Sequence, residues 1–514
     1  MIPLAARCGT ATGPALDLAA RRAFCYIPLV LIARLRNRGE LPAMLFNSWP
    51  FLPFIISVLA LYYLLPFRWQ NRMLLIASCV FYGLWDWRFL ILLMVSTSID
   101  YLVALRIQAS EVAGRRKALL TLSCAANLTI LCFFKYFNFF TENAAVACKL
   151  LGADFAVPHL NVILPVGISF YTFHAMSYNI DVFRHKLNPI RSFPDYMLFV
   201  LFFPQLVAGP IARASILIPQ VTHPRTLRQS QVLEGIWLTL WGFFKKMVIA
   251  DNLAPLVNRV FDADEAATGA QCLLALYAFA YQIYCDFSGY TDIARGLAKL
   301  MGFELSLNFN QPYLARNPAD FWHRWHISLS SWLRDYLYIP LGGSRDGNWK
   351  TYRNLMFTML LGGLWHGAAW NFVLWGAYHG VLLAAHRWLG GEQPRDARAS
   401  RPAWRGWLAC AGMFHLTCLG WLFFRASSVR QIGGMLAKIV TDWSFDQTAV
   451  EMLVPLTIFA GALWVLELWL KNADDPSRRP GWNWGLGPVA VSCVAAAILV
   501  FTAQAPQQFL YFQF

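Results

Sequence analysis

Apolar runs of about 20 residues, the length that a helix needs to cross a bilayer, recur along the whole chain. Clear runs occupy residues 45–65, 73–95, 118–137, 195–212, 268–285, 355–375, 407–424, 450–470 and 485–503, and shorter or more polar ones occupy 161–180, 232–250 and 371–389. Of the 514 residues, 58% are apolar and only 14% are charged. Soluble domains carry about 25% charged residues. We therefore predict an all-α, polytopic membrane protein with about ten to twelve membrane-embedded helices.

The net charge of +15 is explained by membrane topology rather than by nucleic acid. Lys and Arg collect in cytoplasmic loops and contact anionic lipid headgroups. The basic segments here fall between apolar runs, and those near 106–117 and 389–405 favour a cytoplasmic face. We expect membrane lipids as partners and no nucleic acid. The eleven cysteines form no C-x-x-C pair, so neither a zinc site nor a redox motif is indicated.

The first 43 residues differ from the rest of the chain. They hold six arginines and an apolar patch only at 25–33, which is too short to span a bilayer. Met44 opens a complete first helix with its own start. We predict that 1–43 is an extension or the result of a misassigned start, and that 44–514 forms a single integral membrane domain.

Between residues 286 and 354 the chain becomes polar and rich in tryptophan and tyrosine. Aromatic rings with one polar edge favour the membrane interface. Irregular backbone at membrane depth must line protein or a wet cavity. This segment therefore predicts re-entrant or interfacial helices rather than a spanning helix. We expect Asp286 and Asp292 to form structural buried pairs with Arg295, Arg316 or Arg324.

Two histidines are candidates for chemistry. His366 lies in a spanning-type run, and His326 lies in the polar segment. An ionisable group at membrane depth is a functional candidate, and imidazole suits proton abstraction near neutral pH. Gly362, Gly363 and Gly367 flank His366 and leave room for a ligand or for another helix. The alternative for each histidine is a core residue that is hydrogen-bonded to a carbonyl.

A metal site is the rival interpretation of these histidines. His323 and His326 lie three residues apart, on one face if the segment is helical, and His366 and His379 are candidates to join them. No further H-x-x-H occurs in the chain, whereas di-iron membrane enzymes use several such pairs. We therefore predict no metal.

Several sequence blocks resemble those of one known family. FWHRWHISLSSWLRDYLYIPLGG at 321–343 and GLWHGAAWNFVLWGAYHG at 363–380 resemble the signature blocks of the membrane-bound O-acyltransferases. Matching blocks in the same order are MLFNSWPFL at 44–52, LPVGISFYTF at 164–173, FPQLVAGPI at 203–211, QIYCDFSGYTDIARGLAKLMGF at 282–303 and NFNQPY at 308–313. The resemblance covers residues 44–425 and is strongest to the bacterial polysaccharide O-acetyltransferases, with the D-alanine transfer protein of teichoic acid synthesis more distant.

The resemblance implies helices around a tunnel that crosses the membrane, with the active site midway. The family's two site positions map onto His366 and His326, which the resemblance makes the catalytic pair. We expect the substrates to contact Trp325, Arg324, Asn308 and Asn371. This branch commonly reads FWRRWH, whereas residue 323 here is His. We expect that difference to tune activity rather than abolish it.

By this resemblance the chain is an enzyme of the bacterial inner membrane. It is expected to move an acetyl group from a cytoplasmic donor, acetyl-CoA, across the membrane for O-acetylation of an exopolysaccharide such as alginate. A periplasmic acetyltransferase and the exopolysaccharide machinery are the expected partners, and no bound cofactor is expected. The rivals are a transporter or flippase for a polysaccharide or lipid-linked sugar, and an acyltransferase acting on peptidoglycan, teichoic acid or lipid.

Overall fold

The computed structural model describes residues 44–153, 159–262, 267–390, 403–469, 475, 486–503, 507 and 509–510. Every regular element in these ranges is helical, which confirms the all-α prediction. The predicted extension at 1–43 and most of the loop at 389–405 lie outside the described residues.

The helices follow one another with short connections. The first group is α2 (Phe51–Leu64), α3 (Phe67–Ala109), α4 (Ala113–Leu131), η1 (Cys132–Tyr136), α5 (Phe137–Leu150), α6 (Ile168–Phe183), α7 (Phe193–Leu201), α8 (Phe203–Leu206) and α9 (Ala214–Thr222). The second is α10 (Gln229–Phe243), η2 (Phe244–Ala250), α11 (Asp251–Phe261), α12 (Gly269–Leu300), η3 (Pro312–Leu314), α13 (Pro318–Arg324), α14 (Ile327–Leu333), η4 (Arg334–Tyr338), α15 (Asn348–His366) and α16 (Trp370–Trp388). The last is α17 (Ala403–Arg425), α18 (Val429–Thr441), α19 (Gln447–Trp469) and α20 (Leu486–Phe501). The elements η1, η2 and η4 are π-helical.

Four stretches of the described chain are long and apolar enough to cross a membrane, judged by length and composition. They are Phe67–Ala109, Ala113–Leu150, Trp404–Arg425 and Gln447–Leu468. The first is longer than one span needs, and α3 is kinked at Asp86 (φ −159°, ψ 113°). Asp86 Oδ1 accepts a hydrogen bond from the Arg88 amide at 2.9 Å, so the carboxylate caps the second half of α3.

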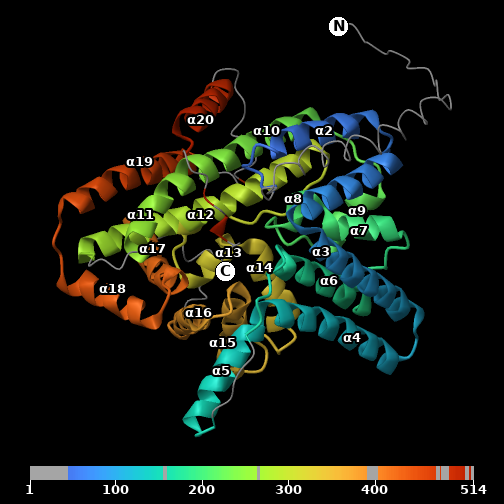
Figure 1. Cartoon of the computed structure of the whole chain (residues 1–514), viewed down its shortest axis with the longest axis horizontal. Coiled ribbons are helices and arrows are strands. Elements are labelled where there is room, and N and C mark those ends of the chain that lie inside the picture. Colours follow the sequence, from blue (N-terminus) through green and yellow to red (C-terminus); the bar gives the residue numbers. More distant parts are fainter. Residues whose placement is uncertain are drawn as a thin grey trace.

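Helix α12 lies in the middle of the bundle, beside α10 and α11 (Figure 1). Glycines allow α10 and α12 to touch through their backbones. A Cβ on Gly242 would lie 2.5 Å from the Gly289 carbonyl oxygen, and one on Gly296 would lie 2.7 Å from the Gly235 carbonyl oxygen. Such small-residue contacts are a common way for membrane helices to pack. The glycine spacing thus fixes which faces of the two helices meet.

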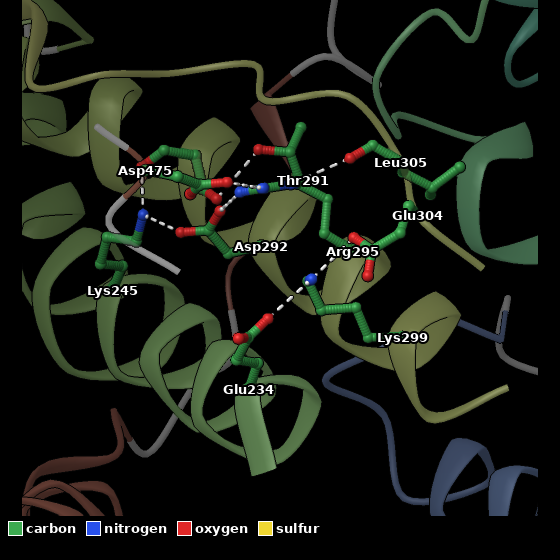
Figure 2. A network of polar contacts seen from close by, with 10 residues as sticks. Glu234, Lys245, Thr291, Asp292, Arg295, Lys299, Glu304, Leu305 and Asp475 are labelled. Carbon is green, nitrogen blue, oxygen red and sulfur yellow. Dashed lines mark hydrogen bonds and ion pairs between the residues drawn. The ribbon is translucent and has the colours of Figure 1, made fainter. Parts of the chain in front are cut away.

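Buried ion pairs join α12 to its neighbours (Figure 2). Lys245 Nζ lies 2.6 Å from Asp292 Oδ2, and Arg295 bridges Asp292 at 3.6 Å and Asp475 at 2.7 Å. The predicted pair of Asp292 with Arg295 is therefore confirmed. Asp286 instead pairs with a lysine on η2, Lys246, at 2.6 Å. That partner was not predicted.

Two sequence predictions need correction. Residues 195–212 do not form one spanning helix, because the chain bends at Phe202 between α7 and α8 (Pro204 follows). The segment 286–354 begins inside α12, so only its part after Leu300 forms the predicted layer of short helices, which are α13, α14 and η4.

Candidate active site

His366 is the last residue of α15, at a break in the chain rather than inside a spanning helix. Extended backbone at Gly367 and Ala369 separates it from α16, so the predicted single run at 355–375 is wrong. The flanking glycines explain the turn. A Cβ on Gly363 would lie 2.2 Å from the Phe372 carbonyl oxygen, so α16 folds back closely against α15. The sequence left open whether Gly363 makes room for a ligand or for another helix, and the structure shows the contact with α16.

Aromatic rings enclose the His366 imidazole, which is 5% exposed. Its ring makes edge contacts with Trp365 (5.0 Å between centroids), Trp375 (5.0 Å) and Phe424 (5.4 Å). These rings come from α15, α16 and α17. A side chain surrounded in this way is shielded from bulk water, which favours acyl transfer to a bound acceptor over hydrolysis.

The end of α15 is held by the π-helical turn η1. Lys135 Nζ donates hydrogen bonds to the carbonyl oxygens of Trp365 (2.8 Å) and His366 (2.9 Å). The Tyr136 hydroxyl donates to the Leu364 carbonyl oxygen at 2.8 Å. The last carbonyls of a helix have no partner within the helix, and a cation suits its negative end. Sequence analysis missed Lys135, although a lysine inside an apolar run is itself a signal.

His326 lies in the turn between α13 and α14 with left-handed backbone angles (φ 43°, ψ 54°). Its Nδ1 is 3.0 Å from Asn308 Oδ1. The Ser328 amide, which can only donate, lies 3.2 Å from the same atom and identifies it as the oxygen. Nδ1 therefore carries the proton and donates it to Asn308. In the neutral ring the lone pair is then on Nε2.

The predicted arrangement of His323 and His326 on one helical face is wrong. Helix α13 ends at Arg324, so the two side chains belong to different elements. His323 is exposed, and its Nδ1 lies 2.6 Å from the Ala319 carbonyl oxygen. Within the part of the chain that the structure covers, no three His, Cys, Asp or Glu side chains gather as a metal site requires.

Both catalytic candidates meet at Trp365. The His326 ring lies 6.1 Å from the Trp365 ring and 4.7 Å from Phe287 of α12. The His366 ring lies 5.0 Å from the same Trp365 ring. The fold thus brings together two histidines that lie 40 positions apart in the sequence.

The other predicted site residues make contacts within the protein. Trp325 is buried between Phe309 (4.9 Å) and Trp421 (4.7 Å). Arg324 Nε donates to Asp320 at 2.8 Å, and Asn371 Nδ2 donates to the Ala426 carbonyl oxygen at 3.0 Å. Asn308 is part of the site through His326. Direct contact of these four residues with substrate stays a prediction.

A family model described as membrane-bound O-acyltransferase matches residues 116–423. The chain belongs to the membrane-bound O-acyltransferase family. The match contains Lys135, Asn308, His326 and His366, and it lies within the predicted range of 44–425. This protein is therefore an O-acyltransferase and a membrane protein, as predicted.

Relatives of this O-acyltransferase differ in the acceptor that their names record. It is 43% identical to a probable alginate O-acetylase of Azotobacter vinelandii, over 81% of this chain and 82% of that one. It is 33% identical to a peptidoglycan O-acetyltransferase of Helicobacter pylori, over 92% and 98%. It is 30% identical to a teichoic acid D-alanyltransferase of Bacillus subtilis, over 52% and 70%.

Proposed function

We propose that this O-acyltransferase moves an acetyl group from cytoplasmic acetyl-CoA across the inner membrane for O-acetylation of an exopolysaccharide such as alginate. A periplasmic acetyltransferase would receive the acetyl group and pass it to the polymer. The likeness to alginate O-acetylases supports the acetyl group and the acceptor. Several apolar helices support a multi-pass protein of the inner membrane.

One observation carries the proposal: the two buried imidazoles of His326 and His366 both contact the Trp365 ring, next to the break between α15 and α16. In the proposed reaction the acceptor hydroxyl oxygen adds to the thioester carbonyl carbon while its proton passes to His366. The tetrahedral intermediate then re-forms the carbonyl, the carbon–sulfur bond breaks, and the leaving thiolate takes the proton from the imidazolium. General base catalysis of this kind contributes about 10²- to 10⁴-fold.

The tautomer of His326 assigns its role. Because Nδ1 donates to Asn308, Nε2 can only accept a hydrogen bond. A hydroxyl can donate to Nε2, whereas a carbonyl oxygen cannot. His326 therefore orients the acceptor hydroxyl rather than the acyl carbonyl.

The test is the acetyl content of the exopolysaccharide, measured by proton NMR in cells that carry the wild type, His366→Ala or His323→Ala. Protein levels in the membrane are matched. His323 is the control because it is an exposed histidine of the same sequence block. Loss of acetyl only in His366→Ala, with polymer yield unchanged, supports the proposal.

The other outcomes contradict it in different ways. Unchanged acetylation in His366→Ala shows that the active site is not at His366. A fall in polymer export itself favours the transporter. Acetyl lost from peptidoglycan rather than from exopolysaccharide changes the acceptor to the one named for the Helicobacter pylori relative.

A further inference from the structure

A small cavity of about 60 Å³ lies directly beside His366. Its walls come from η1, from α15, from the chain before α6 and from the first turn of α6. Lys135, Ser169 and His366 are among the residues that line it. The proposed mechanism leaves one group without a partner, the acyl carbonyl oxygen, which becomes negative in the tetrahedral intermediate. The cavity contains donors suited to that oxygen.

Lys135 is the first donor. Two of its N–H groups reach the carbonyl oxygens of Trp365 and His366, at the negative end of α15, where an ammonium is stabilised. An ammonium has three N–H donors. No residue of the described ranges accepts the third, and Lys135 lines the cavity.

Ser169 is the second donor. The side chain is 9% exposed and lines the cavity, yet its hydroxyl makes no hydrogen bond within the described protein. The hydroxyl is open to the cavity, where it can donate a hydrogen bond to a bound ligand. Ser169 lies in the first turn of α6, whose 16 residues direct the positive end of the helix dipole at this wall.

We propose that Lys135 and Ser169 are catalytic residues that bind the acyl carbonyl oxygen and stabilise the oxyanion. The inference rests on the proposed acyl transfer and adds the electrophilic half of the site. As the acceptor oxygen bonds to the carbonyl carbon, the carbonyl electron pair moves onto oxygen, beside the ammonium and the hydroxyl. When the carbon–sulfur bond breaks, the pair returns and the carbonyl re-forms. His366 on the same cavity wall carries the proton meanwhile.

Lys135 also anchors the end of α15, so the test must separate chemistry from anchoring. Tyr136→Phe provides the matched control. It removes one hydrogen bond from η1 to the same end of α15, and Tyr136 does not line the cavity. Ser169→Ala provides the opposite case, because it removes a group that lines the cavity and breaks no hydrogen bond among the residues that the structure describes.

The measurement is the rate at which acetyl accumulates on the polymer after induction, for the wild type, Lys135→Met, Lys135→Arg, Ser169→Ala, Tyr136→Phe and His366→Ala. Removal of one oxyanion donor lowers turnover by about 10²- to 10³-fold, which is the loss expected for Lys135→Met. Ser169→Ala should lose about tenfold, the value of one neutral hydrogen bond. Tyr136→Phe should stay within about threefold, and Lys135→Arg should recover part of the loss.

The results separate this inference from the function on which it rests. If Lys135→Met does not accumulate in the membrane, the test rests on Ser169→Ala. An acetylation rate of Ser169→Ala within about twofold of wild type then overturns the proposal. Equal losses in Lys135→Met and Tyr136→Phe reduce Lys135 to an anchor and also overturn it. If His366→Ala loses polymer acetylation while Ser169→Ala keeps it, the proposed acyl transfer is supported and the oxyanion assignment is overturned. If the wild type and His366→Ala behave alike, both proposals fall.

Discussion

The amide oxygen of Asn308 fixes the tautomer of His326 across a distance of 3.0 Å. The same oxygen accepts from the amide and the hydroxyl of Ser328, at 3.2 and 2.8 Å. Asn308 thus holds the ring of His326 in place and decides which nitrogen carries the proton. In the proposed mechanism it acts through His326 and is a positioning residue.

Asn308→Ala should lower the acetyl transfer rate by about 10- to 100-fold, because the ring of His326 can then rotate and change tautomer. Ser328→Ala is the control. It removes the hydroxyl donor to Asn308 and the acceptor of the Ile211 amide but leaves the backbone donor to Asn308, so the rate should fall by less than about fivefold. The ratio of the two rates in matched membranes checks the assignment. Equal effects would show that the network is needed for packing only.

Gly363→Ala should destabilise the protein by about 1 to 3 kcal/mol, since a methyl group would collide with the Phe372 carbonyl oxygen. Gly412→Ala on α17 is the control, because a Cβ there meets no atom within 4 Å. Alanine at that position should be neutral or slightly stabilising. Thermal unfolding in detergent measures both. A stable Gly363→Ala variant would contradict the close contact between α15 and α16.

Lys246→Met should cost about 3 to 5 kcal/mol of stability, because Asp251 and Asp286 lose a buried cation that lies 2.8 and 2.6 Å away. Arg259→Gln breaks an ion pair whose side chains are 51% and 53% exposed, and it should cost less than about 1 kcal/mol. The unfolding temperature should therefore fall further in Lys246→Met than in Arg259→Gln. The reverse order would rule out Lys246 as a support for α12.

His323→Arg should keep the acetyl transfer rate within about twofold of wild type, as is usual for exposed positions. The His323 side chain is exposed, whereas His326 is buried beyond the end of α13. The assay is the same polymer acetylation rate. A loss above about tenfold would place residue 323 on a substrate path that the present contacts do not reveal.

Most of the helices were predictable from the sequence because lipid-facing helices must be apolar over a definite length. The runs at 73–95 and 407–424 lie in α3 and α17, and the run at 450–470 lies in α19 as far as Trp469; these helices are among the stretches able to span a membrane. The breaks were not predictable from hydropathy. Phe202 and Gly367 interrupt runs that remain apolar on both sides.

Site residues could be predicted from the sequence only where the type of residue is itself unusual for an apolar run. His326 and His366 stood out as polar groups in apolar surroundings, and the structure places both beside Trp365. Lys135 was visible as a lysine in an apolar run, but its place at the site was not, because its partners are carbonyl groups more than 200 residues away and backbone groups leave no mark in a sequence. Asn308 was expected at the site, but its action through His326 required the turn between α13 and α14.

The π-helical turns make this protein sensitive to the count of its residues as well as to their kind. One residue rotates a helix by about 100°, so deletion of a single apolar residue near η1 would turn Lys135 away from the end of α15. The same holds for η2, whose lysines face the carboxylates of α12. Insertions and deletions inside these apolar helices should therefore disrupt the structure as much as loss of a charged side chain does, although the hydropathy of the helices would hardly change.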